Sequence, residues 1–165
     1  GINKQLSFYE PAVDSLVRQD HSYRTILRLV DFAGLTRGLQ SLLNRGIGRP
    51  GYNLESGFKA LILQWMEDLS DRELERYLQE NNGGKLFCSF TLTEKTPDHC
   101  YFSELRRKIG TERLAKLFNK FGDKLRAQGL VANVFTFVDA SKMISKISLW
   151  DERDKAIKDG QDKLN

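Results

Sequence analysis

The chain has few cysteines and no long apolar segment. Together these features exclude several classes of protein, namely disulfide-rich, zinc-binding and membrane-spanning ones. Its 165 residues include two cysteines, Cys88 and Cys100. Neither has a Cys-x-x-Cys neighbour or a nearby cluster of other ligands, so the sequence supports neither a zinc site nor a disulfide scaffold. No apolar run approaches the ~20 residues that span a bilayer, and the amino terminus lacks a signal-peptide layout. We therefore expect a cytoplasmic protein with reduced cysteines and no membrane partner.

The chain does contain enough apolar material for a packed core. Hydrophobic residues make up 40% of it and aromatic residues 10%, which excludes a wholly disordered chain. This length gives room for one domain, or for one domain plus a fragment of a second. The net charge of +4 is only mildly basic, so the position of the charges says more than their sum.

Basic residues concentrate between positions 106 and 126, where eight are basic and two are acidic. The basic residues are Arg106, Arg107, Lys108, Arg113, Lys116, Lys120, Lys124 and Arg126. Such an excess is typical of a surface that neutralises DNA phosphates. A solvated helix face has the same composition, because Lys and Arg favour helices on any surface. Charge alone leaves both interpretations open.

The first fifty residues predict a helical arm. Apolar residues recur at helical spacing between positions 15 and 44, with a break near Gly34, which indicates two short helices. Residues 44–51 are rich in glycine and basic residues and predict a linker. Through Arg49 this linker could also lie along a phosphate backbone.

Residues 51–130 predict a helical domain. Apolar residues from Leu54 to Leu69 form the stripe of a core helix. Ser70 and Glu73 then have the spacing of a capping box, so a second helix should start at Asp71 and stop near residues 81–84, where glycines permit left-handed backbone geometry. A last amphipathic helix spans residues 114–125 and should end at residues 128–129.

A further helix should lie between the helix that starts at Asp71 and the last helix. Thr96 would be its cap and Pro97 its first residue, and it should end at Ile109. Small polar side chains followed by arginines suit a recognition helix that reads base edges and binds phosphates. A lone histidine in a first turn is more often exposed or hydrogen-bonded than reactive, so His99 is assigned no chemistry. The candidate DNA-binding residues are Arg49, Asp98, His99, Ser103, Arg106, Arg107, Lys108, Arg113, Lys116 and Lys120.

The connection between the helix that starts at Asp71 and this recognition helix exceeds the three to four residues of a compact helix-turn-helix. We therefore expect a helix-turn-helix-like unit with an extra segment, residues 85–90, packed between its helices. Which helix would enter the DNA groove stays open.

A short strand is predicted near the end of the chain. Residues 134–138 are an uninterrupted run of β-branched and aromatic residues, and Asp139 follows them. A carboxylate at the end of a strand can hold a hard cation through oxygen. Asp139 could equally cap a helix.

Four blocks of sequence, in order, resemble bacterial insertion-element DDE transposases of the InsH type. They are Leu-Ser-Asp-Arg-Glu-Leu at 69–74, Thr-Pro-Asp-His at 96–99 with Phe102 and Leu-Arg-Arg at 105–107, the strand with Asp139, and residues 150–156 with 163–165. The resemblance covers nearly the whole chain and is strongest from about Gly51.

The resemblance implies a mainly α protein. Its helical domain would bind the terminal inverted repeats of the element as double-stranded DNA, and residues 131–165 would begin an RNase H-like α/β domain. Asp139 matches the first acid of the catalytic triad and would be a catalytic residue and a ligand of Mg²⁺, of which the parent enzyme holds two.

The sequence stops at Asn165, before the second Asp and the Glu of the triad. We therefore expect an inactive fragment that binds Mg²⁺ weakly, because one carboxylate cannot fix two ions. A single strand without a sheet should pack on the helices, pair with the strand of a second copy as a homodimer, or lose strand structure. Two alternatives stay open: a non-enzymatic helical dimerisation or interaction module, and a domesticated DNA-binding regulator.

Overall fold

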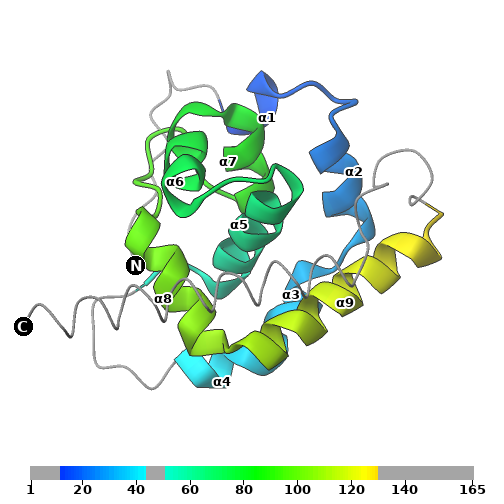
Figure 1. Cartoon of the computed structure of the whole chain (residues 1–165). Coiled ribbons are helices and arrows are strands. Elements are labelled where there is room, and N and C mark those ends of the chain that lie inside the picture. The colour runs from blue at the N-terminus through cyan, green and yellow to red at the C-terminus, as the bar shows by residue number, and fades with distance from the viewer. Residues whose placement is uncertain (1–11, 44–50, 130–165) are drawn as a thin grey trace, which may run out of the picture.

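The computed structural model describes residues 12–43 and 51–129, which form helices and their connections with no strand among them (Figure 1). The mainly α prediction is confirmed for this part of the chain. Arg49, the strand at 134–138, Asp139 and the strand-mediated homodimer lie outside the described residues. The elements are α1 Val13–Leu16, α2 Ser22–Leu29, α3 Phe32–Thr36, the 3-10 helix η1 Arg37–Leu39, α4 Gln40–Leu43, α5 Leu54–Met66, α6 Asp71–Glu80, α7 Asn82–Cys88, α8 His99–Ile109 and α9 Thr111–Ala127.

Helix α5 lies in the middle of the other helices (Figure 1). Its side chains are buried nearly all the way round, and Phe58, Leu61 and Ile62 have no exposed surface. A helix that is apolar on most of its circumference is stable only inside a core. The predicted core helix is therefore confirmed.

The core extends through both described ranges. Phe32 of α3 lies between Phe58 of α5, Phe87 of α7 and Phe121 of α9, with ring centroids 6.3, 5.7 and 5.9 Å away. The contacts with Phe58 and Phe87 are edge-on, and such aromatic contacts add to the free energy gained by burial. The core thus crosses the boundary that the sequence suggested at residue 50, and α2 and α3 are part of one hydrophobic cluster with α5 to α9.

Capping residues decide where α6 and α8 begin. The capping box of α6 is present: the Glu73 amide donates to Ser70 Oγ at 3.3 Å, and the Ser70 amide donates to Glu73 Oε2 at 2.7 Å. For α8 the predicted cap was wrong. The side chain of Asp98, not that of Thr96, accepts a hydrogen bond from the Tyr101 amide at 3.0 Å, because an aspartate two residues later caps equally well.

Helix α6 ends at Glu80, so the predicted stop near residues 81–84 is confirmed, but the glycines do not cause it. Asn81 interrupts the helical backbone, and its side chain accepts from the Gly84 amide at 2.9 Å to start α7, which contains both glycines. A Cβ on Gly84 would lie 2.8 Å from the Tyr77 ring, so glycine is needed there for close packing rather than for a turn. Gly34 similarly lies inside α3, and residues 12–43 form several short helices instead of two.

Candidate nucleic-acid interface

Two side-chain contacts, an ion pair and a carboxylate–histidine hydrogen bond, join α6 to α8. Asp71, the first residue of α6, pairs with Arg106 near the end of α8 at 2.8 Å. Glu75, one turn further along α6, pairs with His99, the first residue of α8, at 2.8 Å. The start of α6 therefore lies beside the end of α8, and the two helices run in opposite directions as one locked unit.

The Arg106 side chain is only 5% exposed. Its Nη1 and Nη2 atoms each donate to one carboxylate oxygen of Asp71 at 2.8 Å. Nη1 also donates to Gln64 Oε1 at 3.3 Å, and Gln64 Nε2 donates to Asp71 Oδ1 at 2.7 Å. This network ties α5, α6 and α8 together.

Arg106, which the sequence predicted as a DNA-binding residue, is therefore buried and does not lie on an exposed helix face. Position 106 is one turn from both Phe102 and Ile109, and these residues face the core. The bidentate ion pair with Asp71 offsets the cost of removing the guanidinium from water.

The other predicted residues of α8 reach the surface. Arg107 and Lys108 are exposed, while His99 and Ser103 are half-buried. Asp98 is exposed, but one of its oxygens is used to cap the helix. Ser103 Oγ donates to the Cys100 carbonyl at 3.0 Å and so keeps acceptor capacity for a ligand.

Helix α9 carries the remaining predicted residues, all exposed. Lys116 pairs with Glu112 at 2.7 Å, and this partner lowers the pKa of Glu112. Arg113, Lys120 and Lys124 have no ion pair with another described residue and recur on one edge of the helix. The basic stretch is thus split between the buried Arg106, the exposed edge of α9 and the end of α8.

Helix α6 places further polar and basic side chains beside the predicted residues of α8, and none of them was predicted from the sequence. Arg72 and Arg76 are exposed, and Arg72 and Gln79 are the helical neighbours of Glu75 at i−3 and i+4. On α8, Ser103 follows His99 by one turn and Arg107 follows Ser103. We call this set the α6–α8 surface: Arg72, Arg76, Gln79, His99, Ser103 and Arg107. Helical spacing in residues 71–80 could have revealed the α6 part, since Leu74 and Leu78 take the core side.

The two cysteines have opposite environments. Cys88 is fully buried in α7, and burial raises the pKa of its thiol far above the ordinary value. Cys100 is an exposed free thiol in the first turn of α8. The described part of the chain therefore offers one accessible thiol, and it lies beside His99.

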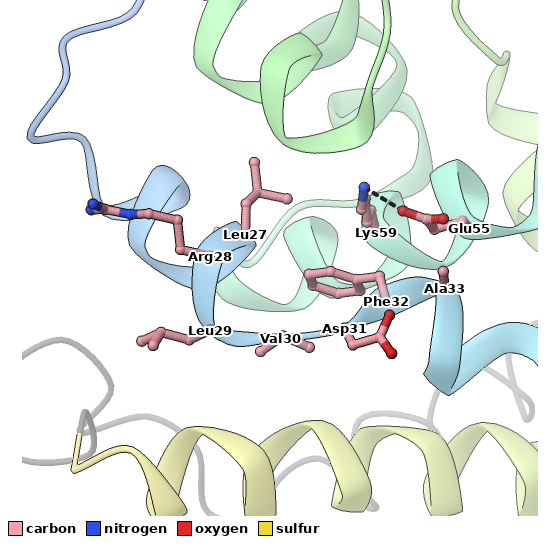
Figure 2. A pocket seen from close by; sticks show the side chains of 9 residues that line it. All are labelled: Leu27, Arg28, Leu29, Val30, Asp31, Phe32, Ala33, Glu55 and Lys59. Carbon is pink, nitrogen blue, oxygen red and sulfur yellow. Dashed lines mark ion pairs between the residues drawn. The ribbon is translucent and has the colours of Figure 1, made fainter.

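An open pocket of about 420 Å³ lies between α2, α3 and α5 (Figure 2). Residues 27–33, Glu55 and Lys59 line it. Figure 2 shows the ion pair of Lys59 with Glu55, at 2.7 Å, in its wall. Lys59 also donates to Ser89 Oγ at 3.1 Å, so its charge is already matched within the protein.

Residues 12–43 and 51–129 carry neither a cluster of metal ligands nor a membrane-spanning helix. No group of three or more His, Cys, Asp or Glu side chains there is arranged to hold a metal ion. None of the helices in these ranges is long and apolar enough to cross a bilayer. Asp139, the predicted metal ligand, is outside them.

The fold and this surface define a helical domain in which two helices, α6 and α8, are held together by side-chain contacts. The family model described as Transposase domain (DUF772) matches residues 11–108. This match spans more than half of the chain, and the chain belongs to this transposase-domain family. The matched range runs from just before α1 to the last turn of α8 and includes the whole α6–α8 surface. Searches of the curated proteins and of the solved structures gave no match.

Proposed function

We propose that this chain is the DNA-binding part of a transposase and that it binds the terminal inverted repeats of its element through the α6–α8 surface. Family membership supports the transposase assignment. The observation that carries the DNA-binding part is the pair of helices fixed by the Asp71–Arg106 and Glu75–His99 contacts. We expect it to act in the bacterial cytoplasm.

A helix pair of this kind suits duplex DNA for two reasons. Its geometry is set before binding, so little side-chain order has to be gained in the complex. It also offers short polar groups, Ser103 and Gln79, for base edges, together with the cations Arg72, Arg76 and Arg107 for phosphates. Helix α7 lies in the connection between α6 and α8. We propose that α6, α7 and α8 act as a helix-turn-helix-like unit with a longer connection than the compact motif has.

Lys108 and the α9 residues Arg113, Lys116 and Lys120 are proposed as further phosphate contacts. All four are exposed, and phosphate contacts position a protein on DNA without reading its sequence. Their removal should weaken binding to all duplexes alike, whereas removal of Ser103 or Gln79 should reduce the preference for the repeats.

The parent enzyme is proposed to be a DDE transposase of the InsH type, which cuts and joins DNA. This finer assignment rests on sequence blocks, including Asp139 as the first acid of the triad. Mg²⁺ at such a triad would activate the attacking oxygen and stabilise the leaving one. Asp139 lies outside the described residues. In this scheme the α6–α8 surface contributes DNA binding.

The test is fluorescence anisotropy with a duplex that carries the terminal repeats and a scrambled duplex, at several salt concentrations. We expect tighter binding to the repeats and a steep salt dependence. Arg107→Gln should weaken binding and lower the salt slope by about one charge. Arg28→Gln is the matched control, because Arg28 is exposed on α2 and lies outside the α6–α8 surface. Equal losses in both variants would contradict the assignment of the surface.

The same titration has a readout that needs no substitution. Bound DNA should protect Cys100 from alkylation, while buried Cys88 stays unreactive in the free and bound protein and serves as an internal control. A complex in which Cys100 reacts at its free rate would mean that DNA binds elsewhere. Failure to bind either duplex, together with self-association, would favour an interaction module.

A further inference from the structure

His99 is held at two points by one carboxylate oxygen. Glu75 Oε2 accepts from the His99 backbone amide at 3.1 Å and contacts ring atom Nδ1 at 2.8 Å. A carboxylate can only accept, so the hydrogen of this second contact is on Nδ1. Hydrogen bonds from His99 also keep the pKa of Glu75 below its usual range, so Glu75 stays ionised. The ring is therefore fixed in orientation.

The other ring nitrogen, Nε2, is available to a ligand. It has no hydrogen-bond partner among the described residues and is not among the buried polar atoms that lack one. The His99 side chain is 35% exposed and that of Glu75 is 27% exposed. His99 thus lies at the seam of α6 and α8, one turn before Ser103, with one nitrogen accessible.

We propose that His99 is a proton-linked DNA contact: the protonated ring donates Nε2–H to a backbone phosphate, and Glu75 is the positioning residue that holds its other side. This inference rests on the proposed function. The complex takes up one proton from solvent, and no covalent bond changes. A neutral ring with its hydrogen on Nδ1 would instead present a lone pair to the phosphate, so the protonated form is the one that binds.

Charges of both signs lie around His99. Glu75 faces the ring from α6, and Asp98 precedes it at the cap of α8. The positive end of the α8 dipole and Arg72, one turn from Glu75, lie on the same side of the helix pair with the opposite sign. A phosphate on Nε2 adds a third negative charge in direct contact with the ring. We therefore expect the balance to change when DNA binds.

The test compares dissociation constants for repeat duplex between pH 6 and pH 8 at constant ionic strength. Imidazole titrates in this range, so binding by the unmodified chain should be about tenfold tighter at pH 6. His99→Gln should remove most of this dependence. Glu75→Gln keeps an acceptor for the His99 amide but removes the charge, and should move the transition to lower pH.

The chain contains two histidines, which gives a matched control. His21 caps α2 by accepting from the Tyr23 amide at 3.2 Å, and His21→Asn preserves a capping side chain. This variant should keep the full pH dependence. It also leaves a single imidazole, so its NMR signal should report the imidazolium form in the complex at pH 7.

The outcomes separate the two proposals. Repeat binding that does not change with pH, a neutral imidazole in the complex, or an unchanged pH profile in His99→Gln would overturn the role of His99 and leave DNA binding in place. No binding to either duplex at pH 6 would overturn the proposed function itself. The NMR measurement on His21→Asn retains His99, so it decides the question even if His99→Gln folds poorly.

Discussion

Arg106 and Arg107 are adjacent in the sequence but have opposite environments. The Arg106 side chain is 5% exposed and bound to Asp71, whereas the Arg107 side chain is 70% exposed and makes only a 3.5 Å contact with Glu104. A surface pair of that length contributes little to stability. The two arginines should therefore respond differently to the same substitution.

We expect Arg106→Ala to lower the free energy of unfolding by about 3–5 kcal/mol, because it leaves the carboxylate of Asp71 mostly buried without its partner. Arg106→Lys should recover only part of the loss, since an ammonium cannot contact both oxygens. Arg107→Ala is the control and should change stability by less than about 0.5 kcal/mol. Urea unfolding measures all three. Equal effects at positions 106 and 107 would mean that Arg106 is not in the buried network.

Helical spacing could have placed Arg106 near the core, since it lies one turn from Phe102 and Ile109, but its charge assigned it to the DNA-binding residues instead. Its partner could not be predicted, because Asp71 is thirty-five residues away and belongs to a different helix. The same holds for His99 and Glu75, which are twenty-four residues apart. Local patterns pointed to the polar and basic residues of α8. Tertiary contacts decide which of these side chains remain exposed.

At the scale of elements, the end of α6 was predicted at the right place for the wrong reason. The predicted stop near residues 81–84 is confirmed at Asn81, but the two glycines that suggested it are buried in the next helix, α7. The sequence alone does not show that the Tyr77 ring approaches Gly84. Tyr77 is itself fixed by a hydrogen bond of 2.9 Å to the Tyr23 hydroxyl.

Gly84→Ala puts two effects in opposition. Alanine favours a helix over glycine by about 1 kcal/mol, but its Cβ would lie 2.8 Å from Tyr77 Cε1 and 3.0 Å from Cδ1. Because the ring is held, we expect the overlap to win and the free energy of unfolding to fall by about 1–3 kcal/mol. The control is Gly38→Ala, where nothing lies within 4 Å of the added Cβ. Thermal unfolding of both variants checks this, and an unchanged or higher Tm for Gly84→Ala would refute the packing argument.

At the scale of the whole molecule, the glycine-rich segment at 44–51 suggested that an amino-terminal arm precedes the helical domain. The contacts of α2 and α3 link this region to the rest instead. Phe32 packs against three phenylalanines of α5, α7 and α9, and the Tyr23 hydroxyl hydrogen-bonds to Glu67 and Tyr77. Breaker residues indicate where a chain turns, but they do not show whether the pieces on either side share a core.

A fragment of residues 51–129 should therefore fold poorly. Without α2 and α3, the buried rings Phe58, Phe87 and Phe121 would lose the neighbour that fills the space between them, and apolar surface would be exposed to water. We expect broad, non-cooperative thermal unfolding for this fragment and a sharp transition for residues 12–129 measured beside it. Phe32→Ala in the full chain reports on the same contact and should cost about 3–5 kcal/mol.

If residues 51–129 unfold as sharply and at the same temperature as residues 12–129, the first helices are an arm after all. In that case the shorter fragment should bind the repeats as the longer one does, because residues 51–129 alone would carry the α6–α8 surface. If instead the short fragment loses its transition, the integrity of α2 and α3 becomes a condition for binding through α6 and α8. In that case Phe32→Ala should weaken binding to the repeats, although Phe32 is not part of the α6–α8 surface. The loss should be larger near the unfolding temperature of the variant than well below it.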